Sequence, residues 1–403
     1  MVRLTRAQQQ ERTRAAVLTA AEAEFTERGY AAAKVDEIAE RAELTRGAVY
    51  SNFPSKRALY LAVLVDIVER SAWAERSAWA ERGGPAERRA TAGRKAVAER
   101  GGTGAAQPPA AAVADALGAF ARTWLEHMPL AGGAPSPGRM RLRSSDALLD
   151  DEPIRNAFGQ VTHLEALLLA LALESQAPGG ALSGRQVRRA QLVMRLLDGA
   201  GPSADPALGL GDPFDIVQAC AHLGGLALAD TWNPPHLPYV PPARTCHDPW
   251  SPPPEMPDLI THRPVTLTED GVITLLGTNR LKAAEETVRA ARTGDLVTVV
   301  VTTADPAETG RLVQVRAGDF ARCLRRVFEP GTWPRLRLVL DERGLLASAV
   351  GVPDADDTTE YAVRVRHGAI VTRAQGLGAA LGAATSDLTN AAVSGTTPEG
   401  AAR

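Results

Sequence analysis

Apolar side chains recur every three or four positions through the first half of the chain, a spacing that predicts helices. In the first predicted helix, Val17, Ala21 and Phe25 share one face, and Gly29 ends the helix as a C-terminal cap. Residues 35–42 repeat the spacing and predict a second, shorter helix with one buried face.

Capping and helix-breaking residues mark two further helices. Thr45 is a good N-cap, so we expect a third helix from there to about Asn52. Pro54 breaks the chain, and Ser55 caps a fourth helix. Two short helices joined by a tight turn at residues 43–44, behind a longer helix, make a helix-turn-helix. Such an arrangement presents its second short helix to the major groove of DNA.

The polar positions of the third helix have the chemistry that DNA recognition needs. Arg46 can donate two hydrogen bonds to one guanine, and Gly47 lets the backbone approach closely. A scaffold that never touches DNA is the alternative, but packing alone would not require Arg46, Tyr50 and Lys56. The candidate DNA-contacting residues are Lys34, Thr45, Arg46, Gly47, Ala48, Tyr50, Ser51, Asn52 and Lys56.

The run from Gly29-Tyr30 through residues 35–42 (VDEIAERA) to residues 45–56 (TRGAVYSNFPSK) resembles the N-terminal domain of TetR-family regulators. The resemblance implies an all-helical homodimer that binds a palindromic operator on double-stranded DNA. In that family the usual member is a repressor that a small-molecule effector releases.

Three positions depart from the pattern of that family. Lys34 stands where a Ser or Thr usually caps the second helix, and a lysine cannot accept the capping hydrogen bond. Glu43 replaces the usual turn glycine and would repel phosphate unless it points away from DNA. Arg57 replaces a common glutamate and adds positive charge.

Helical patterns continue to residue 230, and the resemblance implies an effector pocket and a dimer interface in this region. The dimer helices would lie near residues 184–199 and 212–229, where Asp212-Pro213 makes a good helix start. Candidate seam residues are Leu192, Val193, Leu196, Ile216, Ala219 and Leu223. Candidate pocket residues are Trp124, His127 and His163, because aromatic and histidine side chains in apolar surroundings often line buried pockets.

After residue 230 the composition changes. Residues 231–263 are rich in proline, including Pro252-Pro253-Pro254, and predict a stiff extended linker. Beyond it, β-branched runs at residues 272–276, 296–301 and 336–340 predict strands, with a helix between the first two. A hairpin is expected around His367-Gly368.

Residues 264–385 resemble thioredoxin-like domains, especially those of methylamine-utilisation accessory proteins. An active thioredoxin needs a Cys-x-x-Cys pair after its first strand. Here that stretch is Thr278-Asn279-Arg280-Leu281-Lys282, and Glu360 replaces the usual proline before the hairpin strand. We therefore expect a domain without redox chemistry, and the alternative function is a thioredoxin-like oxidoreductase or redox sensor fused to a helical domain.

The composition restricts the class of protein and its compartment, but it does not identify a function. The net charge is −2, so any affinity for DNA must come from a local patch. The cysteines number three, which favours a reducing compartment, and with no signal peptide or apolar run of about 18 residues we expect a cytoplasmic protein. Cys246-His247, His236 and His262 match no zinc spacing. We expect no catalytic residues, metal or cofactor.

The sequence thus predicts a multidomain protein, all-α and TetR-like in its first part and α/β in its second. The expected parts are a helix-turn-helix domain (1–60), a helical ligand-binding and dimerisation domain (61–230), a Pro-rich linker (231–263), a thioredoxin-like domain (264–385) and a disordered tail (386–403).

Overall fold

The computed structural model describes residues 5–81, 109–126, 149–175, 184–203, 212–230, 232, 243–292, 294–328 and 336–386. The chain divides into two compact units. The helical unit comprises Met1–Phe158, Glu165–Asp230 and Ala307–Pro334, and the α/β unit comprises Gly159–Leu164, Thr231–Pro306 and Arg335–Arg403. The predicted tail beyond Ser386 lies outside the described residues.

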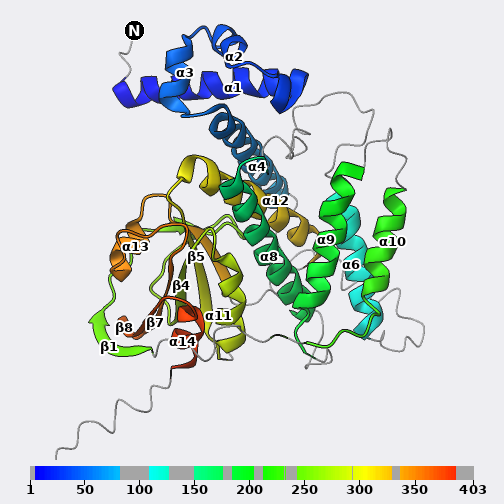
Figure 1. The fold of residues 1–403 in the computed structure, drawn as a ribbon, viewed down its shortest axis with the longest axis vertical. Helices are drawn as coiled ribbons and strands as arrows, with labels where there is room; N and C mark the ends of the chain where they lie inside the picture. The colour runs from blue at the N-terminus through cyan, green and yellow to red at the C-terminus, as the bar shows by residue number, and fades with distance from the viewer. Residues whose placement is uncertain are drawn as a thin grey trace, which may run out of the picture. The chain divides into compact units, whose positions relative to one another are not determined.

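The helical unit begins with the predicted helix-turn-helix (Figure 1, blue). Thr45 accepts a hydrogen bond from the Ala48 N–H, and Ser55 accepts one from the Ala58 N–H, so both predicted N-caps are confirmed. The helices are α1 (Arg6–Ala32), α2 (Val35–Arg41), α3 (Arg46–Asn52), α4 (Lys56–Glu81), α6 (Pro109–Glu126), α8 (Glu152–Ser175), α9 (Val187–Ser203), α10 (Pro213–Leu223) and α12 (Arg311–Val327).

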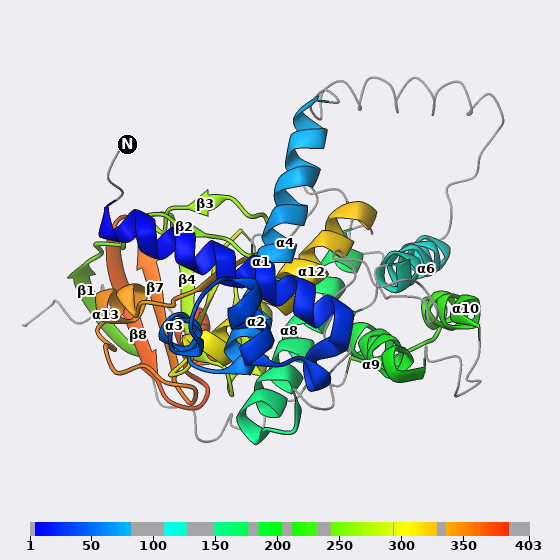
Figure 2. The ribbon, with the colours of Figure 1, turned by 90° about the horizontal axis from the view of Figure 1, so that it is seen from above.

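Helix α12 is the unexpected member of the helical unit. Residues 307–334 lie within the range that the sequence assigned to the α/β domain, yet they cluster with the helical unit. Helix α12 packs against α4 and α6, and Figures 1 and 2 both show it beside α4. Its Leu312 and Val315 are part of the same hydrophobic core as Phe53, the C-cap of α3.

The α/β unit has a six-stranded sheet in the order β1-β8-β7-β4-β5-β6. Strands β4, β5 and β6 are parallel, whereas β7 and β8 form an antiparallel hairpin beside β4. His367 and Gly368 both have positive φ, which confirms the predicted hairpin turn. The strands are β1 (Arg244–Pro249), β2 (Met256–Pro257), β3 (Pro264–Val265), β4 (Gly271–Gly277), β5 (Leu296–Thr302), β6 (Leu336–Leu340), β7 (Glu360–Arg366) and β8 (Ala369–Gln375).

Both faces of this sheet are covered. On one face, Ile273, Val300 and Tyr361 form an apolar core with Leu346 and Val350 of α13 (Leu345–Val350). Helices α11 (Ala284–Ala290), which follows the 3₁₀ turn η6 (Leu281–Ala283), and α14 (Ala379–Thr385) contact the sheet and each other. Neighbouring side chains of β7 point to opposite faces of the sheet, so the same strand contributes apolar side chains to both faces.

The predicted linker differs from the structure over its second half. Strand β1 pairs antiparallel with β8, and Trp250 is buried with its indole Nε1 donating to the Leu267 carbonyl at 2.6 Å. Asp258 is also buried and accepts from the Leu338 N–H at 3.0 Å. Strand β1 lies at the sheet edge, where a proline such as Pro249 is tolerated because one side of the strand has no ladder partner.

Helix α8 is the helix in the described part of the chain that is long and apolar enough to cross a membrane by composition. Of its most apolar stretch, 67% is buried inside the protein. Such burial is typical of a core helix in a globular protein.

Candidate nucleic-acid interface

The turn between α2 and α3 is closed by backbone hydrogen bonds. The Leu44 N–H donates to the Ala39 carbonyl at 2.9 Å, and the Glu43 N–H donates to the Glu40 carbonyl at 3.0 Å. Glu43 has a φ of +55°, in the left-handed region that favours glycine. The glutamate at this position is therefore conformationally strained as well as negatively charged, and its side chain is exposed.

Helix α3 rests on the core through Val49 and leaves most of its surface exposed. Its N-terminal residues Thr45, Arg46 and Gly47 are exposed, as are Tyr50 and Ser51 further along. A Cβ added to Gly47 would meet no atom closer than 3.9 Å within the protein. Packing within the protein therefore does not require a glycine at this position. Because glycine has no side chain, the backbone N–H groups remain open to a ligand.

Arg46 is held loosely by its neighbours. Its Nη1 lies 3.3 Å from an Asp36 carboxylate oxygen, and its guanidinium lies 5.5 Å from the centre of the Tyr50 ring. The hydrogen bond to Tyr50 and the charge of Asp36 raise the pKa of Arg46. The side chains of Arg46 and Asp36 are 60% and 66% exposed, so solvent screens the pair and Arg46 can exchange it for a DNA partner.

Lys34 and Lys56 have different surroundings. Lys34 is exposed and makes no side-chain cap at the start of α2, which confirms the sequence expectation. The Lys56 ammonium donates to the Ala31 carbonyl at 3.1 Å and lies 4.9 Å from the centre of the Tyr30 ring. Burial lowers the pKa of Lys56. An ammonium has three donors, so Lys56 can keep the Ala31 contact and still reach a phosphate.

Ser51 and Asn52 direct their donors to their own helix. The Ser51 hydroxyl and the Asn52 amide both donate to the Ala48 carbonyl at 2.9 Å. Ala48 and Asn52 are half-buried. The structure therefore leaves Lys34, Arg46 and Tyr50 as the more accessible side chains of the predicted set.

Glu24 of α1 is a structural residue of this domain that the sequence reasoning missed. Its fully buried carboxylate lies 3.1 Å from Arg28 and 3.4 Å from Arg41, and it accepts from the Lys34 N–H at 3.4 Å. The carboxylate thus ties the backbone of Lys34, the residue before α2, to α1. The sequence held no local signal for this contact, because the two residues are ten positions apart.

The three candidate pocket residues have different outcomes. Trp124 is buried, with its ring centre 6.0 Å from that of Phe120 and 6.1 Å from that of Phe320. His163 is exposed, and its Nδ1 lies 2.8 Å from the Gly159 carbonyl. His127 lies outside the described residues.

A buried charged cluster lies next to Trp124. Arg316 of α12 lies 2.5 Å from the Glu165 carboxylate and 3.4 Å from that of Asp198, and its guanidinium is 5.6 Å from the centre of the Trp124 ring. Burial raises the pKa of Glu165 to about 8, against the attraction of Arg316. Among the described residues, Trp124 Nε1, Glu165 Oε1 and Arg316 Nε are buried without a hydrogen-bond partner.

Comparison with known proteins places the helix-turn-helix in a family. Residues 17–63 match the profile described as "Bacterial regulatory proteins, tetR family". A stretch of 51 residues is 51% identical to the HTH-type transcriptional activator FasR of Mycolicibacterium smegmatis. That match covers 13% of this chain and 23% of FasR, so the chain aligns with about a quarter of that relative. Residues 17–63 therefore have the sequence pattern of the N-terminal domain of the TetR regulatory family.

Proposed function

We propose that this protein is a ligand-responsive transcriptional regulator that recognises a palindromic operator as a homodimer, with α3 in the major groove. The observation that carries the proposal is the exposed surface of α3, where Arg46 and Tyr50 are accessible and Val49 anchors the helix. We infer repression as the regulatory outcome. The partly matched relative is named an activator, so a reporter assay decides the sign.

The proposed roles follow from the exposure of each group. Arg46 leaves Asp36 and donates two hydrogen bonds to a guanine, which provides sequence discrimination. Thr45 and Gly47 bring the helix N-terminus close to the DNA backbone. Lys34 and Lys56 contribute charge to phosphates, and that charge acts on any sequence.

The experiment is a selection of bound duplexes from random DNA, followed by affinity measurements on the selected palindrome and on a scrambled duplex. Arg46→Ala should weaken binding to the palindrome by roughly 10- to 100-fold and leave scrambled DNA nearly unaffected, as for loss of one bidentate base contact. Lys56→Ala should weaken binding to both and lower the salt dependence by about one phosphate contact.

Arg343→Ala is the control, because Arg343 is exposed in the turn after β6 and lies outside both the proposed DNA interface and the proposed dimer helices. It should change neither affinity. Failure of the wild-type protein to select any sequence would end the proposal. Equal losses for Arg46→Ala on both duplexes would remove Arg46 from base reading.

The proposed dimer uses α9 and α10. Asp212 caps α10 by accepting from the Phe214 N–H at 2.9 Å, and Phe214 and Ala219 are exposed on that helix. Val193, in contrast, is fully buried within the protomer and is withdrawn from the seam. A footprint with two protected half-sites about 34–36 Å apart supports the dimer.

The proposed effector site is the surroundings of Trp124. Three buried polar atoms, on Trp124, Glu165 and Arg316, have no hydrogen-bond partner in the part of the chain that the structure describes and lie near aromatic rings, whereas buried polar groups normally have partners. A mainly apolar ligand with a small polar head would satisfy these atoms. Mass spectrometry of small molecules released from the purified protein identifies it.

For the α/β unit we propose a thioredoxin-like domain without dithiol chemistry. The order β5-β4-β7-β8, with a parallel pair joined to an antiparallel hairpin, supports it. Residues 278–282 after β4 contain no cysteine, and Glu360 pairs with Arg280 at 2.6 Å at the position expected for proline. These features favour a regulator over the alternative oxidoreductase. Cytoplasmic location remains part of the proposal.

A further inference from the structure

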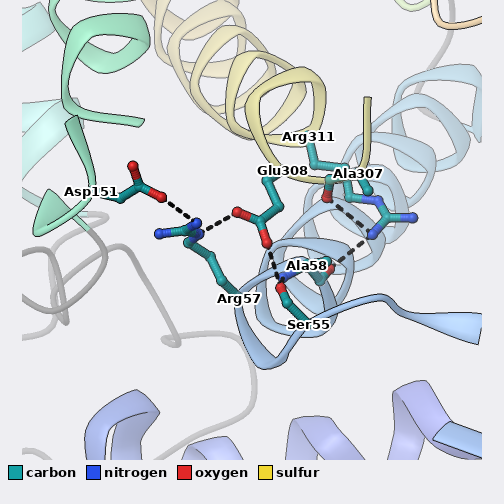
Figure 3. A network of polar contacts seen from close by, with 7 residues as sticks. All are labelled: Ser55, Arg57, Ala58, Asp151, Ala307, Glu308 and Arg311. Atoms are coloured by element: carbon teal, nitrogen blue, oxygen red, sulfur yellow. Dashed lines mark hydrogen bonds and ion pairs between the residues drawn. The ribbon is translucent and has the colours of Figure 1, made fainter. Parts of the chain in front are cut away.

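A group of polar contacts joins the start of α4 to the turn before α12. Ser55, the N-cap of α4, donates its hydroxyl hydrogen to Glu308, and the Nε of Arg57 donates to the other oxygen of the same carboxylate (Figure 3). Arg311 donates to the Ala58 carbonyl at 2.8 Å. We call Ser55, Arg57, Asp151, Glu308 and Arg311 the Glu308 network.

The centre of the network is largely shielded from solvent, and its cation Arg57 is paired with two carboxylates. Arg57 lies between Glu308 and Asp151 and donates to Asp151 Oδ2 at 2.6 Å. The side chains of Arg57 and Glu308 are 21% and 11% exposed. At such low exposure an ion pair is screened far less than a surface pair, so its loss is felt by the elements it joins.

Apolar contacts extend the same attachment toward the recognition helix. Phe53, the C-cap of α3, is buried with Arg14 of α1 at 4.8 Å from its ring centre and Arg311 at 5.7 Å. Leu312 and Val315 of α12 belong to the core that holds α1, α3 and α4. The segment at residues 307–315 therefore touches the chain on both sides of Pro54, where α3 ends and α4 begins.

From these contacts we propose that Glu308 is a positioning residue for DNA binding, which fixes the angle between the helix-turn-helix and the helical core. The inference rests on the proposed function, because angle matters only if two helix-turn-helix domains must meet one operator together. A domain free to pivot at residues 53–57 would lose orientational freedom on binding a palindrome, and that loss weakens affinity. Residues 307–334 lie between β5 and β6 in the chain. The contacts that fix this angle therefore come from the part of the sequence that also forms the α/β unit.

The test compares two duplexes: the palindrome that the wild-type protein selects, and the same duplex with one half scrambled. Glu308→Gln removes the charge with little change in shape. It should weaken binding to the full palindrome by about tenfold, and it should leave single half-site affinity within about twofold. A variant that merely destabilised the helix-turn-helix would lose both affinities equally.

Asp319→Asn is the matched control, since Asp319 is a carboxylate of α12, the helix that follows Glu308, and its described ion pair is with Arg322 on the same helix. It should bind both duplexes as the wild type does. Arg57→Gln should reproduce the effect of Glu308→Gln, and the double variant should be no worse than either, as for two groups that act through one contact. Arg57→Gln also serves if Glu308→Gln fails to fold.

Unchanged palindrome affinity in both variants, with a functional wild-type protein, would overturn the positioning role and leave the proposed function intact. Parallel losses on the palindrome and the half-site would also overturn it. Absence of operator binding by the wild-type protein would instead contradict the proposed function.

Discussion

At the scale of single residues, the helix-turn-helix carries one position that works against both its fold and its function. Glu43 adopts a φ of +55°, and a side chain in the left-handed region costs about 1–2 kcal/mol relative to glycine. Its carboxylate also stands on the turn that leads into α3. Conformation and charge can be separated by two substitutions.

Glu43→Gly should raise the free energy of unfolding by up to about 1 kcal/mol, because strain is relieved while the unfolded chain gains some freedom. Glu43→Ala keeps the positive φ with a Cβ and should give no such gain. Both variants remove the carboxylate and should bind DNA equally more tightly. Urea unfolding and a binding titration provide the measurements, and equal stabilities of the two variants would refute the strain argument.

Helix caps and tight turns were the part of the fold that the sequence predicted best. Thr45, Ser55 and Asp212 cap their helices with bonds to residues two or three positions away, and such bonds depend only on neighbours in the chain. The His367-Gly368 turn is equally local. Gly29, with φ +72° and ψ 168°, ends the regular part of α1 as predicted.

At the scale of elements, the partner of α12 could not be predicted. Its spacing shows an apolar face, but the side chains that cover that face lie on α4 and α6, far away in the sequence. The pair Arg57–Glu308 joins positions 251 apart. For the same reason the sequence does not show that the Lys56 ammonium donates to the Ala31 carbonyl, 25 positions away.

The contact of α8, α9 and α12 around Arg316 predicts a pH-dependent stability. Burial raises the pKa of Glu165 from its ordinary value to about 8 in the folded protein, so the fold favours the uncharged acid. That contribution is complete below the ordinary pKa of a glutamate, near 4.5, and is lost as the pH rises through about 8. One proton limits the slope to about 1.4 kcal/mol per pH unit.

Urea unfolding between pH 5 and 8 checks this prediction. The free energy of unfolding of the wild-type protein should fall with pH relative to that of Glu165→Gln, in which the group cannot ionise. Glu11→Gln, at an exposed position of α1, should follow the wild type. Parallel curves for the wild type and Glu165→Gln would show that Arg316 keeps Glu165 charged throughout.

At the scale of the whole molecule, the predicted boundary at residue 230 does not separate the helical unit from the rest. The unit also needs residues 307–334, among them Leu312, Val315 and Phe320. Each such buried side chain contributes about 1.5–3 kcal/mol, and together they approach the total stability of an ordinary domain, about 5–15 kcal/mol.

A fragment of residues 1–230 should therefore lack a cooperative thermal transition and bind an apolar dye, because Phe120 and Leu59–Leu64 lose their cover. A chain shortened only at Ser386 is the control and should unfold cooperatively. Calorimetry of both proteins provides the comparison. A fragment 1–230 that melts sharply and binds the selected operator would show that α12 is dispensable.

The place of α12 in the chain also sets the order of events during synthesis. The core that contains Val17 and Leu64 is incomplete until Val315 has been synthesised, about 250 residues after Leu64. At roughly 5–20 residues per second, that interval lasts about 12–50 s. During this time part of the apolar surface of the nascent helix-turn-helix has no cover, and exposed surface of this kind makes a chain prone to aggregate. If the protein binds an operator as proposed, binding should begin only after residues 307–315 have been translated.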